Sequence, residues 1–190
     1  MFGNIFRRSF VLMVSPACVL FGSSQSMAGP PISTQTYDIA PVPCEGLYLD
    51  GIAYAFIVAG APSLDCIAGS FVGPGFTNNI DSPNIEGTSA GVLHVTFDVP
   101  TTHFGFGVAQ NTFASPQVQS VIIDLFRPGA GLLREEMFLD ATNDPGFVGG
   151  RYDYVGPAVK TVTIRHSGPF SRFALDNVTH FRPPGLTRLH

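Results

Sequence analysis

The chain has 190 residues, 45% of them hydrophobic, which is enough to build one domain around a buried core. Gly (21 residues), Pro (16) and Phe (17) are abundant, whereas Trp is absent. This composition favours short strands joined by turns and argues against a helical bundle, which needs more Ala, Glu and Lys. A net charge of −4 offers no basic surface for nucleic acid, so no nucleic-acid partner is expected.

Residues 1–28 have the features of a secretory signal peptide. Arg7 and Arg8 form a short positive region, an apolar stretch follows, and Ser26-Met27-Ala28 supplies small residues for cleavage. The apolar stretch, roughly 13 residues, is too short to span a bilayer. The arginine pair also resembles a twin-arginine export signal, but lacks the preceding Ser or Thr. We therefore predict a secreted, periplasmic or cell-surface protein with no membrane span in the mature chain.

Export would leave two cysteines, Cys44 and Cys66, in an oxidising compartment, where one disulfide is the simplest outcome. Closing a loop of about 23 residues is worth about 3 kcal/mol in the chain-entropy model. A metal pair is the alternative, but no His lies near either cysteine and the spacing fits no zinc pattern. The prediction is a disulfide.

The mature chain divides into a leader at 29–33, a strand-rich domain at 34–182 and a tail at 183–190. Thr34 to Ile39 is expected to be the first strand. A turn and a strand are expected within 47–59, and 60–89 is expected to be mostly loop, with short strand pieces.

From Ala90 onward, apolar residues recur in the period of strands, with turn residues between the runs. Turns are expected at Pro100-Thr101 and at Gly156-Pro157. The predicted strands are 91–99, 102–109, 120–126, 132–139, 147–155 and 159–166. Phe104 and Phe106 should share one face of their strand, with Gly105 on the other.

The last predicted strand, residues 169–181, is the one on which the expected architecture depends. Phe173 and Leu175 alternate with small or polar residues, as in a strand with one face against a core. We expect this strand to pair with the first strand and to close an antiparallel β-sandwich of jelly-roll type. The turn spacing indicates about eight to ten strands.

From Gly46 to Phe181 the order of motifs resembles the β-sandwich domains of secreted bacterial proteins that often carry a PEP-CTERM-type sorting tail. The more specific motifs are Phe97-Asp98-Val99-Pro100, followed by Phe104-Gly105-Phe106, and Ala174-Leu175-Asp176-Asn177-Val178. Such domains look like carbohydrate-binding jelly rolls, so the resemblance implies a module without chemistry of its own. The sequence lacks the Pro-Glu-Pro motif and apolar helix of the sorting tail, which predicts a released protein.

In jelly-roll carbohydrate-binding modules a structural calcium often lies where the first and last strands meet. The resemblance therefore implies Asp38, on the opening strand, and Asp176, on the closing strand, as candidate ligands, with backbone carbonyls and water completing the shell. The alternative is that Asp176 accepts hydrogen bonds from backbone N–H groups of a nearby loop.

No set of residues predicts an enzyme. Glu135 and Glu136 are adjacent on one strand, so they point to opposite faces and cannot act as a pair across a cleft. The five histidines show no metal-ligand spacing, and no Gly-x-Ser-x-Gly motif occurs.

A sugar-binding surface usually exposes aromatic rings. Tyr152 and Tyr154 share one face of a predicted strand and Tyr48 lies near a loop, so these three are the candidate ligand-binding residues for an extracellular carbohydrate. The alternative is that their rings pack in the core or at its edge. A structural surface or matrix protein that binds no small molecule is the second functional hypothesis, and an extracellular hydrolase is the third.

Overall fold

The computed structural model describes residues 32–70, 79–111, 119–142, 146–167 and 172–181. The predicted signal peptide, most of the leader and the tail lie outside these residues. Twelve strands, all paired antiparallel, make up the described part, which confirms the predicted all-β class and antiparallel sandwich. Three of the strands have only two residues: β2 (Val42–Pro43), β3 (Tyr48–Leu49) and β5 (Ala61–Pro62). No helix in the described part is long and apolar enough to cross a membrane.

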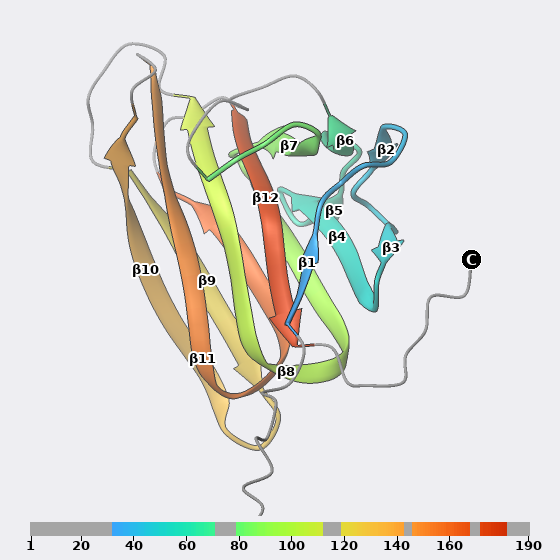
Figure 1. Ribbon diagram of the computed structural model, residues 1–190, viewed down its shortest axis with the longest axis vertical. Coiled ribbons are helices and arrows are strands. Elements are labelled where there is room, and N and C mark those ends of the chain that lie inside the picture. The colour runs from blue at the N-terminus through green and yellow to red at the C-terminus, as the bar shows by residue number, and fades with distance from the viewer. Residues whose placement is uncertain (1–31, 71–78, 112–118, 143–145, 168–171, 182–190) are drawn as a thin grey trace, which may run out of the picture.

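Two long strands belong to both layers of the sandwich: β8 (Gly91–Asn111, 21 residues) and β11 (Phe147–His166, 20 residues). The first half of β8 pairs with β4 (Ile52–Val58), and its second half pairs with β12 (Arg172–Phe181). β11 follows β8 along both halves, with register shifts between Val155 and Thr161. Both strands bend sharply near the bottom of Figure 1. The bends fold one continuous sheet onto itself.

The first layer contains β10 (Gly131–Ala141), β9 (Gln119–Arg127), the second half of β11, the first half of β8, and β4. The second layer contains the remaining halves of β11 and β8, followed by β12, β7 (Asn84–Thr88), β6 (Cys66–Ser70) and β2. β1 (Ile32–Gln35) pairs with the end of β12.

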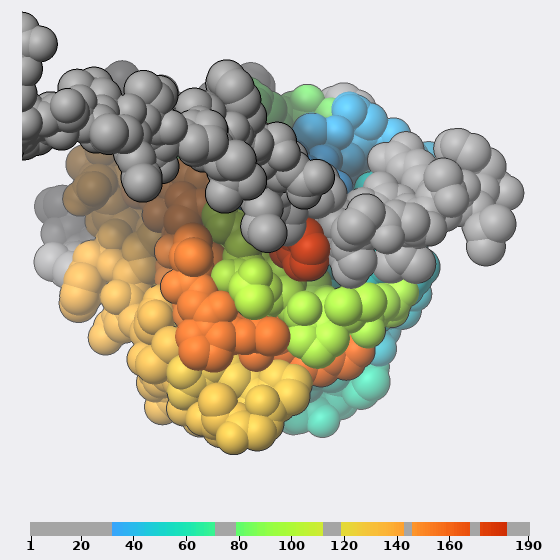
Figure 2. Space-filling view, turned by 60° about the horizontal axis from the view of Figure 1, so that its bottom comes forward, coloured from blue at the N-terminus to red at the C-terminus, as the bar shows by residue number. Residues whose placement is uncertain are grey.

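The predicted turns at Pro100-Thr101 and Gly156-Pro157 are wrong, because β8 and β11 run through both positions. These residues lie at the bends, where the register between the two strands shifts. A bulge interrupts the ladder, so a proline can be placed there without losing a hydrogen bond. The bends lie next to each other at one end of the molecule, beside the turn between β9 and β10 (Figure 2).

The core lies between the layers and is built mainly from phenylalanine. Phe56 of β4 meets Phe173 of β12 across the interior, with ring centroids 6.1 Å apart. Phe97 and Phe104 lie on the two halves of β8, and their ring centroids are 5.4 Å apart near the bend. Inward residues alternate with outward ones along β4 and the first half of β8, as the sequence period predicts.

The pairing of the first and last strands is confirmed, with Ile32 opposite Phe181 and Gln35 opposite Val178. β1 begins two residues earlier than predicted and ends at Gln35, so it includes the last two residues of the predicted leader. β12 is buried on both faces rather than one. Its outer face is covered because Ile80 packs on Ala109 and Ala174.

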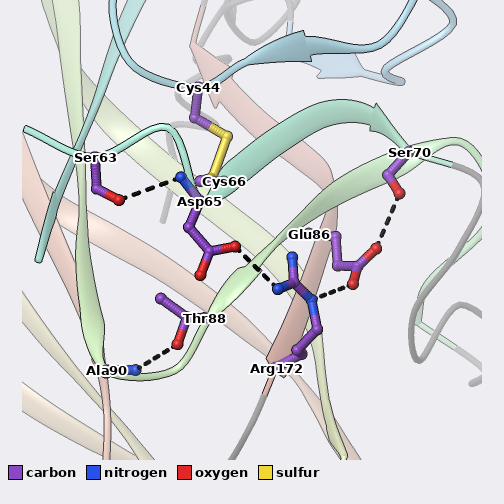
Figure 3. A network of polar contacts seen from close by, with 9 residues as sticks. All are labelled: Cys44, Ser63, Asp65, Cys66, Ser70, Glu86, Thr88, Ala90 and Arg172. Atoms are coloured by element: carbon purple, nitrogen blue, oxygen red, sulfur yellow. Dashed lines mark hydrogen bonds and ion pairs between the residues drawn. A yellow bond between two sulfur atoms is a disulfide. The ribbon is translucent and has the colours of Figure 1, made fainter.

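The region expected to be mostly loop contributes β5, β6 and β7 to the sheets, while residues 71–78 lie outside the described part. The predicted disulfide is present: Cys44 and Cys66 are bonded and fully buried. Beside it, Arg172 at the start of β12 pairs with Glu86 of β7, and its Nη1 lies 3.0 Å from Asp65 (Figure 3). The Ser70 hydroxyl donates to Glu86 over 3.0 Å. These bonds fasten β12 to β7 and β6.

Candidate functional site

The candidate site is the outward surface of the first layer, which we call the outer face. Strand register aligns its side chains in rows that run across the sheet. One row consists of Leu132, Phe126, Thr161, Thr96, Ala53 and Tyr48, contributed by β10, β9, β11, β8, β4 and β3 in that order.

This row has an exposed aromatic ring towards each end and small side chains between them. Phe126 is 42% exposed and Tyr48 is 58% exposed. The Thr161 and Thr96 hydroxyls lie 3.4 Å apart, and Ala53 follows. Four strand spacings separate the aromatic residues, or about 19 Å between their backbones. The row therefore offers two aromatic surfaces on either side of a low, partly polar strip.

The next row carries fixed charged groups. Asp124 of β9 accepts hydrogen bonds from Arg134 Nε (2.6 Å) and Nη2 (3.1 Å) of β10, and from Arg165 Nη2 (2.7 Å) of β11. The bond from Arg134 is the main reason why the pKa of Asp124 is lowered. Thr163 and His94 continue the row on β11 and β8. Asp124 thus holds two guanidinium groups in fixed positions, and Arg134 remains largely exposed.

Two arginines and two carboxylates balance each other in the part of the outer face formed by β10, β9 and β11. Arg134 and Arg165 are matched by Asp124 and by Glu136, whose carboxylate accepts a bond from the Ser120 hydroxyl over 2.5 Å. A cluster with directed donors and acceptors and matched charges suits an uncharged polar ligand better than an ionic one.

Of the three predicted aromatic ligand residues, only Tyr48 lies on the outer face. Its hydroxyl donates to the Asp98 carboxylate, and this bond is the main reason why the pKa of Tyr48 is raised. The bond holds the ring in a defined orientation at the end of the row.

Tyr152 and Tyr154 share a face as predicted, but that face is the core. They are 6% and 5% exposed. The Tyr152 ring packs on the Phe106 ring, with centroids 5.3 Å apart. The Tyr152 hydroxyl donates to Glu135 Oε2 over 2.6 Å. The Tyr154 hydroxyl donates to the Pro157 carbonyl over 2.7 Å. Their ring faces are occupied by protein, in agreement with the packing alternative.

Phe126 and the Asp124 cluster were not recognised from sequence. Residues 120–126 form a nearly continuous apolar run, which indicates a strand buried on both faces. The pairing of Phe126 with Leu132 and Thr161, both on the outward side, is what places its ring on the surface. That pairing is a tertiary feature with no local signal.

The two predicted calcium ligands, Asp176 and Asp38, have different environments and different hydrogen-bond partners. Asp176 is buried and its Oδ2 accepts the Asp81 backbone N–H over 2.9 Å, which is the loop contact given above as the alternative. Burial raises the pKa of Asp176. Asp38 accepts the Thr36 hydroxyl over 2.9 Å. Within the described ranges, no three His, Cys, Asp or Glu side chains are grouped as a metal centre requires.

The adjacent acids of β10 lie on opposite faces, as predicted. Glu135 points inward to Tyr152 and Glu136 points outward to Ser120. They cannot flank one bond of a substrate, so they do not form the carboxylate pair of a glycoside hydrolase.

No protein-family model matches the chain, and no curated protein matches it. Several solved structures are similar in fold. A family 29 carbohydrate-binding module variant complexed with mannohexaose is 10% identical, with a TM-score of 0.39 over 80% of this chain and 91% of that one. The C-terminal family 22 carbohydrate-binding module of Clostridium thermocellum Xyn10B is 10% identical, with a TM-score of 0.40 over 78% and 96%.

A two-module fragment of the same xylanase, complexed with xylohexaose, is 9% identical, with a TM-score of 0.38 over 83% of this chain and 29% of that one. Likenesses of this size assign neither a family nor a ligand. The resemblance to PEP-CTERM-type proteins stays a prediction from sequence.

Proposed function

We propose that the protein is a secreted, non-catalytic module that binds an uncharged polysaccharide across the outer face of its first layer. The observation that carries this proposal is the row with Phe126 towards one end and Tyr48 at the other. Aromatic rings pack against the apolar faces of sugar rings, while polar side chains bind hydroxyl groups. The row provides both kinds of contact along a line long enough for several sugars.

Arg134 gives the proposed ligand its polar anchor. Because Asp124 fixes the guanidinium group from one side, its remaining donors are directed without further loss of side-chain freedom. The threonine hydroxyls and His94 add groups that both donate and accept. The balanced charge disfavours acidic polysaccharides, since these need a net positive surface.

The test is binding to insoluble and soluble polysaccharides (cellulose, xylan, mannan and a polyuronate) by pull-down and affinity electrophoresis. We expect Phe126→Ala and Tyr48→Ala each to weaken binding to a neutral polymer by about 10-fold, or about 1.4 kcal/mol. Phe138→Ala is the matched control, because Phe138 is also exposed on the same face but lies outside the row. Equal loss in all three variants would refute the proposed row. If the native protein binds none of these polysaccharides, the binding proposal is wrong and the structural surface or matrix role is favoured.

A structural calcium at Asp176 remains a separate proposal. Asp176 Oδ1 is buried and has no hydrogen-bond partner in the described part of the chain, so one carboxylate oxygen is available to a cation. Asp38 and Asp81 lie close enough to raise its pKa further. Calcium requires six to eight oxygen ligands. If a cation is bound there, EDTA should lower the melting temperature of the native protein and leave that of Asp176→Asn unchanged. An identical melting temperature with calcium and with EDTA would exclude it.

Export is supported by the disulfide, since such bonds persist in oxidising compartments. Sequencing the N-terminus of the exported protein should place the cleavage after Ala28. Export that fails in a strain lacking the twin-arginine pathway would identify the route.

A further inference from the structure

β8 ends, and β9 and β12 begin, at the end of the sandwich opposite the bends (Figure 1). A group of buried polar side chains lies at this end. Gln110 of β8, Gln119 of β9 and His166 of β11 all point towards the core. Gln110 lies beside Phe173 in the second layer, and the Phe173 ring stacks on His166 with centroids 4.4 Å apart. Three strands of two layers thus bring polar groups to one place.

Strand register puts Gln119 within reach of His166, which in turn contacts Gln110. His166 is paired with Val121, and Gln119 is two residues from Val121 on the same face of β9. Diagonal neighbours of this kind have backbones about 7–8 Å apart, which long side chains bridge. Gln110 Nε2 already contacts His166 Nδ1 directly.

Most of the polar atoms in this group are buried without a partner. Gln110 is 0% exposed and Gln119 is 1% exposed. Among the described residues, nothing bonds to Gln110 Oε1, to either amide atom of Gln119, or to His166 Nε2. Leaving a buried polar atom unpaired destabilises the folded state, and native proteins rarely leave several together. Four such atoms at one place call for an occupant that forms hydrogen bonds.

The chemistry of the three side chains defines that occupant. Two primary amides and one imidazole supply both donors and acceptors. None of the three carries a charge at neutral pH, because burial lowers the pKa of His166 to about 3. A buried ion with no counter-charge would be strongly disfavoured here. The occupant must therefore be uncharged and must donate as well as accept.

We propose that Gln110, Gln119 and His166 form a buried binding site for a small uncharged polyhydroxy ligand, either a polyol or a single sugar residue. The site lies in the interior, whereas the outer face is on the surface of the first layer. The proposal of this site is therefore independent of the proposed polysaccharide binding, and either can be wrong without the other. Because Gln110 Nε2 donates to His166 Nδ1, the proton of the neutral imidazole is on Nε2. Hydroxyl groups fit because each can accept from an amide N–H or from His166 Nε2–H and can donate to an amide oxygen.

The experiment is a titration of the ¹⁵N-labelled native protein with glycerol, glucose, mannose and galactose, following the side-chain amide signals of Gln110 and Gln119 by NMR. At least one probe should give saturable shifts of both glutamines in the millimolar range. Gln119→Met, which keeps the shape but removes two unpaired atoms, should abolish saturation and should leave folding stability equal or higher. Phe138→Ala, a surface variant outside the row, should give the same saturable shifts of Gln110 and Gln119 as the native protein.

Shifts that stay linear in concentration for every probe would overturn the proposal and indicate a site filled by water alone. Saturable shifts that persist in Gln119→Met would also overturn it. Polyols raise melting temperatures generally because they are excluded from protein surfaces, so only the difference between native protein and variant counts in a thermal assay. If Gln119→Met does not fold, the titration of the native protein decides the question.

Discussion

The single residue whose environment makes the strongest prediction is His166. Its ring is stacked on Phe173, and its pKa is lowered to about 3 by burial, whereas an unfolded histidine has a pKa near 6.5. Below pH 6.5 the unfolded state takes up a proton that the folded state does not. Stability is therefore lost as the pH falls, by about 1.4 kcal/mol for each pH unit between about 6.5 and 3. Urea unfolding at a series of pH values measures this slope.

The control for this prediction is a second histidine. His94→Gln should keep the acid slope, because His94 lies on the outer face, whereas His166→Phe should flatten it. Asp176 has a raised pKa and acts with the opposite sign, since its ionisation destabilises the folded state as pH rises. The difference between native protein and variant removes that contribution. A slope that is the same in both variants would show that His166 is not the cause.

Single residues also show where reading the sequence succeeds. The placement of Gly105 and Gly107 opposite Phe104 and Phe106 was predictable from alternation alone. The reason for glycine was not: a Cβ at Gly107 would lie 1.8 Å from the Asn79 carbonyl oxygen, which belongs to a segment packed on the outside of β8. Alternation is encoded locally, but the approach of a distant segment is not.

Among the elements, β8 and β11 show the same limit. Pro100 and Gly156-Pro157 carry the local chemistry of turns, and in isolation they predict chain reversal. In the structure the two strands bend together, each keeping the other as its neighbour on both sides of the bend. The long-range pairing outweighs the local turn preference. As a result, the sequence predicts two strands where the structure has one strand that belongs to both layers.

The start of β12 depends on Arg172, which bonds to Glu86 and Asp65 (Figure 3). Glu86 is almost fully buried, so removing the guanidinium leaves its carboxylate with the Ser70 hydroxyl alone among the contacts described above. We expect Arg172→Met to cost about 2 kcal/mol in unfolding free energy. Arg134→Met is the control, since that arginine is more exposed and should cost about 1 kcal/mol or less. Equal costs in chemical denaturation would argue against the fastening role.

The edge of the first layer makes another prediction at this scale. β10 pairs with β9 along one side, and on the other it pairs with β11 only at Asp140 and Ala141. An inward charge on an edge strand, here Glu135, opposes pairing with a second molecule. Glu135→Leu should therefore increase self-association in light scattering. Glu136→Leu makes the same charge change on the outward side and should increase it less. Equal association would mean that the inward position is unimportant.

At the scale of the whole molecule, the shared strands make the two layers one cooperative unit. A break in either layer disturbs β8 and β11, which carry the other. Phe56→Leu in the first layer and Phe173→Leu in the second should each cost about 1–3 kcal/mol and shift a single unfolding transition. Because the two rings are in contact, the double variant should cost measurably less than the sum of the single ones.

Far-ultraviolet and near-ultraviolet circular dichroism, recorded on the same samples, separate backbone from aromatic unfolding. Coincident curves in the native protein and all variants are expected, because no layer can lose its strands while the other keeps them. A first transition that appears only in Phe56→Leu would mean that β4 and its neighbours melt alone. In that case the two layers would unfold separately, although both contain β8 and β11. Additive costs in the double variant would likewise show that the phenylalanine contact between layers transmits no coupling.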